Sequence, residues 1–290
     1  MLELGLDVYP RLYKKVGMRE LKGLRIPRRG VGVPAPEAQP CYELDDVLKV
    51  ARHVVCKEDW WEWRAQATFC LQAISGARAH AICTLPLKAI DLDGLWMRQD
   101  PRLGVWTKND ARATTCLMNI PELLEPVRSW FEFLAKQVGP NGLFFNPFDR
   151  DANGLVLTER PAGDNRVSAL MGDYKDLCAV SSIPYRGTHG LRRFHIGFIL
   201  MRCKDIEDFQ ALLHNVMHKS LSTTELYIKP KQDKLAERYR QFVSVAPVTR
   251  SPQEAMALAE QQMSQMPNSP MMVEMHTMMK CMFEEYLGKK

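Results

Sequence analysis

The sequence predicts a mainly α-helical fold with a small antiparallel β-sheet, and three observations lead to this prediction. Segments with the helical spacing of apolar residues cover most of the chain. One region, residues 88–121, instead holds short apolar or alternating runs separated by Asp-Gly, Asp-Pro and Asn-Asp, which is typical of about three short strands. The chain of 290 residues, 46% of them hydrophobic and 25% charged, is long enough for a substantial globular core.

The segment before this region predicts two helices. Residues 42–55 place apolar side chains at helical spacing, and residues 59–86 continue as further helix. In both segments we expect one side to face the core. The apolar positions of the first helix are Leu44, Val47, Leu48, Ala51 and Val54.

The segment after the expected sheet returns to helix. Residues 121–138 begin with Pro121, which suits the first helical turn, and Gly139 follows at the expected end. Residues 140–165 are rich in glycine, asparagine and aspartate, so we expect a loop with one short strand. Several helices are expected between residues 167 and 243.

The chain is expected to divide into three parts. Residues 1–40 combine a short helix with a basic linker rich in proline and glycine, which disfavour helix. Residues 41–245 form the main domain. Residues 246–290 form a helical tail, which begins with a helix cap at Ser251 and ends with a methionine-rich amphipathic helix over residues 270–287.

Composition and charge narrow the class of protein. The formal net charge of +5 favours an anionic partner only weakly, so the local grouping of charge has to identify one. The eight cysteines show neither a Cys-x-x-Cys pair nor zinc-ligand spacing, which predicts reduced, mostly buried thiols. Because the sequence shows no signal peptide and no apolar run of about 18 residues, we expect an intracellular protein without a membrane span.

Basic residues recur in an order that suggests phosphate chemistry. His189 and Arg192 stand one helical turn apart in an otherwise apolar segment, so both can face one cavity. Arg78 precedes the expected sheet, and Lys108 lies at a turn within it. Two guanidinium groups, an ammonium group and an imidazole are together well suited to hold a phosphodiester and to move protons around it.

Three sequence boxes follow one another in a fixed order. They are "SGARAHAICTLPLKAIDLD" around Arg78, "HGLRR" from His189, and "HKSLSTTELY", in which His218 lies nine residues before Tyr227. With Lys108 between the first and second boxes, this order resembles the tyrosine recombinases, the phage integrase family. The resemblance extends from about Tyr42 to Tyr239. It implies that residues 41–245 are a recombinase catalytic domain and that the N-terminal clamp domain of the family is largely missing.

The residue types suit this chemistry independently of the resemblance. A phosphodiester under attack gathers negative charge on its non-bridging oxygens, which Arg78 and Arg192 can hold with forked donors. Tyr227 is the expected nucleophile, and since a phenol has a pKa of about 10 it needs a base, which we assign to His189. The covalent phosphotyrosine keeps the energy of the broken bond, so neither ATP nor a metal cofactor is expected.

The resemblance assigns the remaining roles. Lys108 would protonate the departing 5′-oxygen, and His218 would donate to a phosphate oxygen. His214 is an alternative to His218, because the spacing from Arg192 to His218 is longer than the family pattern. His195 is expected to be a hydrogen-bonded histidine of the core.

These observations predict a site-specific DNA recombinase, or integrase, that works through a 3′-phosphotyrosyl intermediate. The resemblance implies double-stranded DNA as the partner, a homo-tetramer on paired sites, and a bacterial or phage-encoded protein acting on the nucleoid in the cytoplasm. The tail either passes into a neighbouring subunit or folds back onto its own domain. Two alternatives stay open: a type IB topoisomerase-like enzyme, and a non-catalytic DNA-binding relic of an integrase.

Overall fold

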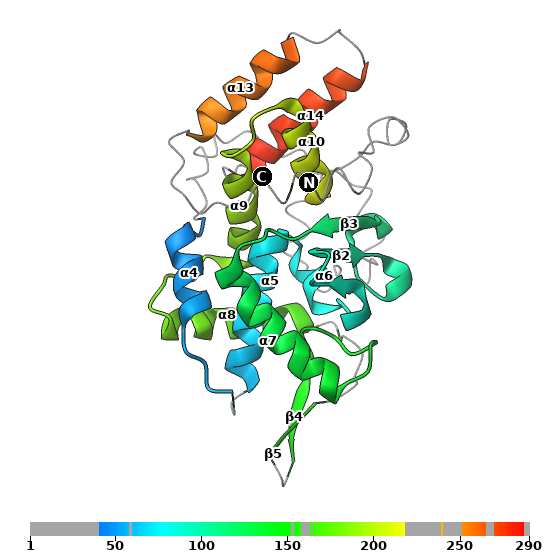
Figure 1. Ribbon diagram of the computed structural model, residues 1–290, viewed down its shortest axis with the longest axis vertical. Helices are drawn as coiled ribbons and strands as arrows, with labels where there is room; N and C mark the ends of the chain where they lie inside the picture. The colour runs from blue at the N-terminus through cyan, green and yellow to red at the C-terminus, as the bar shows by residue number, and fades with distance from the viewer. Residues whose placement is uncertain are drawn as a thin grey trace, which may run out of the picture. The chain divides into compact units, whose positions relative to one another are not determined.

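A computed structural model describes residues 41–57, 60–151, 154–157, 163, 165–217, 239, 251–264 and 270–286 (Figure 1). The chain divides into two compact units, Met1–Glu37 and Ala38–Lys290, and all of the described residues belong to the second. The expected N-terminal helix and linker therefore lie outside the described residues. The predicted fold class, mainly α with a small antiparallel sheet, is confirmed.

Helices make up most of the described residues. The helix expected over residues 121–138 is confirmed, with Pro121 in its first turn. Three short 3₁₀ turns, η1 (Leu87–Ala89), η2 (Pro101–Leu103) and η3 (Lys108–Asp110), flank the strands. The α-helices are α4 (Leu44–Arg52), α5 (Trp60–Ser75), α6 (Ala79–Cys83), α7 (Pro121–Gln137), α8 (Arg166–Val180), α9 (Gly187–Leu200), α10 (Ile206–Asn215), α13 (Pro252–Ser264) and α14 (Pro270–Tyr286).

The predicted three-stranded sheet is also confirmed. Its strands are β1 (Ile90–Asp91), β2 (Trp96–Gln99) and β3 (Ala113–Cys116). They pair antiparallel in the order β1-β2-β3, with Met97 of β2 opposite Thr115 of β3. The connection between β2 and β3 is long, and it contains the turn at which the sequence predicted Lys108.

Residues 140–165 contain two strands rather than the one expected. β4 (Phe148–Asp151) and β5 (Gly154–Leu157) pair antiparallel as a hairpin, with Asp149 opposite Val156. Asn153 and Gly154 form an Asn-Gly dipeptide at the start of β5, which favours tight hairpin turns, and the prediction gave this signal too little weight.

Helix α5 is the centre of the core, and the expectation that only one of its sides faces the core is wrong. All residues from Trp63 to Ser75 are buried. Helices α4, α7, α8 and α9 all pack against α5 (Figure 1). Because its apolar side chains are spread around the whole helix, it has no face that favours solvent. Its buried Gln66 is satisfied by the carbonyl groups of Val50 (2.8 Å) and His53 (2.7 Å).

The expected continuous helix over residues 59–86 is interrupted at Gly76. Gly76 has a φ of +63°, a left-handed conformation that residues with a Cβ rarely adopt. A Cβ at this position would also lie 2.7 Å from Cδ2 of His195, so the available space requires glycine as well. Helix α5 therefore ends at Ser75, and the chain becomes helical again at Ala79.

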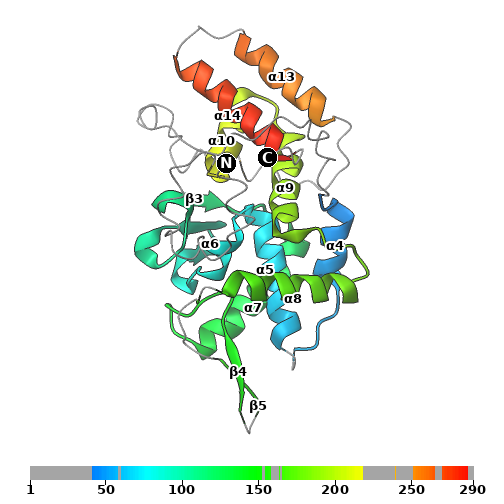
Figure 2. The same cartoon turned by 180° about the vertical axis from the view of Figure 1, so that it is seen from behind.

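The tail helices pack on the domain of their own chain. Helix α14 contacts α9 and α10, and α13 contacts α10 and α14 (Figures 1 and 2). Met279 and Met282 of α14 are fully buried. The ring of Tyr286 lies against Gly197 of α9, at a place where a Cβ on residue 197 would collide with it. In this single chain the tail helices fold back, and passage of the tail into a neighbouring subunit stays a prediction.

The cysteines behave as the sequence predicts. All eight are free thiols, and five of them are buried. Burial raises the pKa of the Cys70 thiol, as it does for an unreactive thiol in a core. Among the residues described, we find no helix with the length and apolar character needed to cross a membrane.

Candidate functional site

An open cavity of about 550 Å³ lies between α6 and the connection from β2 to β3. Arg78 and Lys108 both line it, together with Trp106 and Met217. Two of the predicted site residues, which come from different parts of the sequence, therefore share one cavity.

Arg78 directly precedes α6 and is partly buried. Desolvation lowers the pKa of Arg78, and the positive charge of Arg192 lowers it further, whereas Glu285 raises it. Two guanidinium groups and one carboxylate therefore lie within electrostatic range of one another. Such a cluster has enough positive charge to hold a further anion.

Lys108 lies in a turn that is well fixed by its neighbours. Asn109 and Asp110 take positive φ values of 59° and 51°, which asparagine and aspartate tolerate better than most residues. The hydroxyl of Thr107 donates to the carbonyl of Ala111 (2.7 Å) and closes the turn. The side chain of Lys108 itself is exposed, so its ammonium group can reach an anion in the cavity.

His189 and Arg192 lie one turn apart near the start of α9, as predicted, but they differ in exposure. Arg192 is only 2% exposed, whereas His189 is exposed. Desolvation by the surrounding protein lowers the pKa of His189, and Glu285 opposes this while Arg192 and Arg78 add to it. A lowered pKa keeps the imidazole neutral at neutral pH, as a proton acceptor requires.

Each nitrogen of the Arg192 guanidinium donates a hydrogen bond within the protein. Nε donates to Oε1 of Glu285 (2.6 Å), Nη1 to the carbonyl of Gly76 (2.8 Å) and Nη2 to the carbonyl of Val216 (2.6 Å). Glu285 belongs to α14, so the tail reaches the predicted site. Because Arg192 is almost completely buried, an anion from solvent cannot reach its guanidinium in this arrangement.

Gln72 fixes the spacing between two parts of the site, and it was not predicted. Its Nε2 donates to the carbonyl of Ala77 (2.9 Å) and, over a longer distance, to that of Thr188 (3.4 Å). These two residues immediately precede Arg78 and His189. A glutamine within a long, mostly apolar helix is the signal that could have identified it, since buried polar groups need partners, although Gln66 of the same helix gives the same signal.

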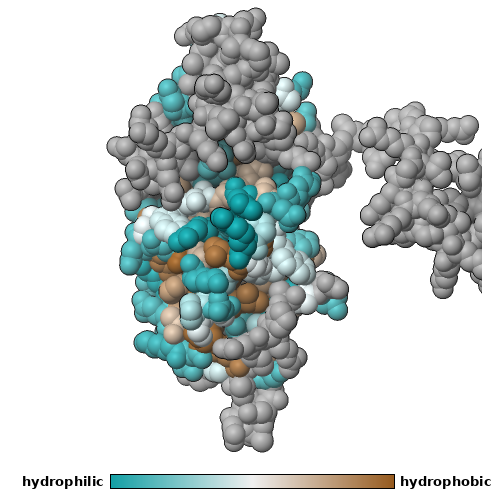
Figure 3. All heavy atoms as spheres, turned by 90° about the vertical axis from the view of Figure 1, so that its right-hand side faces the viewer, coloured by the Kyte–Doolittle hydropathy of each residue, from teal (hydrophilic) through white to brown (hydrophobic). Residues whose placement is uncertain are grey.

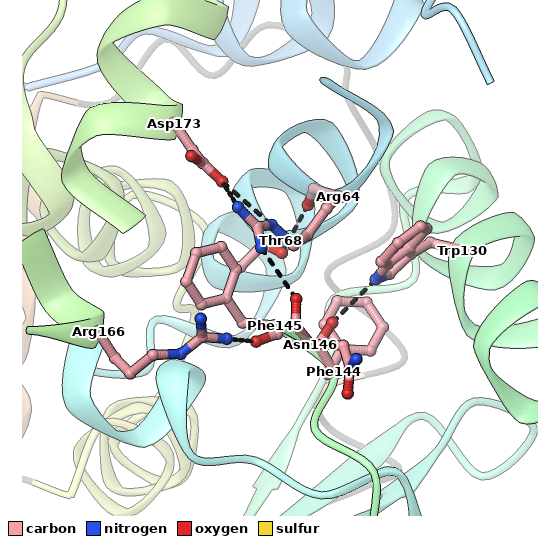
Figure 4. Close-up of polar contacts among 8 residues, drawn as sticks. All are labelled: Arg64, Thr68, Trp130, Phe144, Phe145, Asn146, Arg166 and Asp173. Carbon is pink, nitrogen blue, oxygen red and sulfur yellow. Dashed lines mark hydrogen bonds and ion pairs between the residues drawn. The ribbon is translucent and has the colours of Figure 1, made fainter. Parts of the chain in front are cut away.

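A second arginine cluster lies in the core and has a structural role (Figure 4). Arg64 donates to the carboxylate of Asp173 (2.5 and 3.1 Å) and to the carbonyl of Asn146 (2.9 Å), and Arg166 donates to the carbonyl of Phe145. Both guanidinium groups lie over the ring of Phe145. Desolvation lowers the pKa of Arg166 to about 10. We infer that the contacts of this cluster stabilise the packing of α5, α8 and the segment 144–146 on one another.

His218 and Tyr227 lie outside the described residues. The chain is described as far as Met217, which lines the cavity. Two residues earlier, Asn215 attaches the end of α10 to the sheet, because its Oδ1 accepts from the N–H of Cys116 (2.6 Å) and its Nδ2 donates to the carbonyl of Cys116 (3.1 Å).

The other two histidines of interest are placed by the structure. His214, the alternative to His218, lies on α10 and is not among the described residues that line the cavity. His195 is fully buried, and its Nδ1 is hydrogen-bonded to the carbonyl of Ala73 (3.1 Å). Burial lowers the pKa of His195 to about 3. The prediction of a hydrogen-bonded core histidine is confirmed.

Carboxylates near the sheet have local structural roles. Oδ1 of Asp91 accepts from the N–H groups of Asp93 (3.0 Å) and Gly94 (2.7 Å) and closes the turn after β1. Within the part of the chain that the structure describes, no group of three or more His, Cys, Asp or Glu side chains is arranged to hold a metal ion.

Comparison with known proteins finds similarity only at the level of structure. No protein-family model and no curated protein matches the chain. XerA recombinase is similar with a TM-score of 0.45 and 18% identity, over 78% of this chain and 72% of that one. The integrase from mycobacterium phage Brujita is similar with a TM-score of 0.48 and 17% identity, over 87% of this chain and 74% of that one. At these values the likeness concerns the path of the chain, and the chemistry must be inferred from the side chains.

Proposed function

We propose that this chain is a site-specific DNA recombinase that cleaves and rejoins DNA through a 3′-phosphotyrosyl intermediate. Arg78 and Arg192 hold the non-bridging oxygens of the scissile phosphate. Tyr227 attacks the phosphorus, and His189 accepts the proton of its hydroxyl.

In the same step the bond from phosphorus to the 5′-oxygen breaks. Lys108 gives a proton to the departing oxygen, and His218 donates a hydrogen bond to the phosphate. One phosphate ester bond forms as another breaks, so rejoining by a 5′-hydroxyl needs neither ATP nor a metal ion.

One observation supports this proposal most strongly, namely that basic residues distant in sequence meet at one place. Arg78 and Lys108 line the same cavity. His189, Arg192 and Arg78 lie within electrostatic range of one another. Arg78 and Lys108 repel each other, so their position on one open cavity is favourable when an anion is bound there, whereas His189 and Arg192 are not among the described residues that line it.

The hydrogen bond from Arg192 to Glu285 supports the proposal of a resting form, in which α14 occupies the guanidinium. A carboxylate and a phosphate both offer oxygens to a guanidinium fork, so DNA and Glu285 would compete for Arg192. We extend the proposal accordingly: α14 leaves its own domain when four copies assemble on paired DNA sites, and it then packs on a neighbouring subunit.

The proposal can be tested with a pool of nicked DNA duplexes of randomised sequence. Cleavage near a nick releases a short strand, so the covalent complex cannot be reversed and survives detergent. We expect the parent protein to capture a defined sequence and Tyr227→Phe to capture none. Tyr185→Phe, which also removes one phenolic hydroxyl, is the matched control and should capture as the parent does. Equal capture by Tyr227→Phe would show that another nucleophile acts.

The same material separates the alternatives. A type IB topoisomerase would relax a supercoiled plasmid that lacks the captured sequence, whereas a recombinase would join two duplexes only when both carry it. A DNA-binding relic would bind the pool and capture nothing.

A further inference from the structure

Trp106 is an exposed aromatic residue beside the cavity. Its side chain lies in the connection from β2 to β3 and is 46% exposed, whereas Trp63 and Trp130 belong to the buried core. It lines the same cavity as Arg78 and Lys108. Exposure of an indole to water is unfavourable, and at the edge of a cavity it suits contact with a ligand.

The backbone of Trp106 is held firmly relative to Arg78. The preceding residue, Val105, is fully buried. The N–H of Trp106 donates to the hydroxyl of Thr84 (2.8 Å), and this hydroxyl donates to the carbonyl of His80 in α6 (2.9 Å). Since α6 begins directly after Arg78, one short helix links the positions of the indole and the guanidinium.

The surroundings of the indole indicate the chemistry of its ligand. Figure 3 views the molecule from the side on which the sheet lies in Figure 1, and hydrophilic and hydrophobic residues adjoin each other on this face. Basic groups next to an exposed aromatic ring are the combination that binds nucleotides, because the basic groups hold the phosphate and the ring packs on the base or sugar. A phosphate alone would make no use of the ring.

We propose that Trp106 packs against the base or sugar of the nucleotide next to the phosphate held by Arg78 and Lys108. This rests on the proposed function, because it takes DNA as the substrate. The contact fixes the nucleotide relative to α6 and so sets the position of the phosphate against Arg78. Contacts of this kind strengthen binding of a nucleic acid by roughly 5- to 150-fold per base.

The experiment compares a mixed-sequence nicked DNA duplex with linear polyphosphate, which has the charge of DNA but no bases or sugars. We expect Trp106→Ala to weaken binding of the duplex by roughly 5- to 150-fold and to leave binding of polyphosphate unchanged. Trp106→Phe keeps a ring and should retain most of the affinity for DNA. Lys108→Ala, which removes only charge, should weaken the binding of both ligands.

Tryptophan emission provides a second measurement on the same variants. Binding of the duplex should change the emission of the parent, and this change should be absent in Trp106→Phe. Unchanged affinity of Trp106→Ala for the duplex would overturn the inference, as would equal losses for duplex and polyphosphate, which would indicate a general effect on the fold. If the parent binds no DNA at all, the proposed function fails instead.

Discussion

Replacing Glu285 by glutamine should accelerate the proposed covalent capture of DNA. The carboxylate accepts from Nε of Arg192 at 2.6 Å, and the two side chains are 18% and 2% exposed. Glutamine keeps the shape and a neutral acceptor but removes the charge. A hydrogen bond between charged groups contributes about 1.5–3 kcal/mol and a neutral one about 1, so docking of α14 should weaken by roughly 0.5–2 kcal/mol. This corresponds to a factor of roughly 2–30 in the equilibrium between docked and released α14.

The assay is the initial rate of formation of the detergent-resistant complex with the nicked duplex. We expect Glu285→Gln to raise this rate by roughly the same 2–30-fold, because release of α14 must precede phosphate binding at Arg192. Hydrogen exchange of the α14 amides should accelerate by a similar factor. Glu284→Gln, on the same helix, is the control and should change neither quantity. Faster exchange without faster capture would show that α14 does not control access to the site.

Two further predictions concern the core and the tail. Burial lowers the pKa of His195 from 6.5 to about 3, so the unfolded chain binds more protons between these pH values and the folded state loses stability as the pH falls through this window. Urea unfolding should show a loss of about 2 kcal/mol at about pH 5 that is absent in His195→Gln, and equal pH dependence in both proteins would contradict the assignment. Deleting the chain after Arg250 should leave binding to a single DNA site nearly intact and weaken assembly on paired sites, as measured by gel shift and light scattering, whereas unchanged assembly would exclude exchange of the tail.

Features that depend on residues close in sequence could be predicted. The spacing of His189 and Arg192 placed both on one helix near its start, and the structure agrees. The turn dipeptide Asn109-Asp110 placed Lys108 between two strands, because these residues accept positive φ with little strain. In both cases a few neighbouring residues determine the local backbone, and the chemistry follows from that backbone.

Contacts between residues distant in sequence could not be predicted in this way. Arg192 and Glu285 are 93 positions apart, and no local pattern distinguishes Glu285 from the other carboxylates of the chain. The same holds for Gln72 and Thr188, which are 116 positions apart. The sequence therefore identified candidate residues of the site. It did not predict that Glu285 of α14 packs against one of them, Arg192.

Gly76 ties the core and the site to a single peptide unit. Its carbonyl accepts a hydrogen bond from Arg192, and the absence of a Cβ leaves room for the ring of His195. A larger residue at this position would displace both partners together, and a change in either partner alone could not restore the fit. In related sequences, Gly76, Arg192 and His195 should therefore be conserved together or change together.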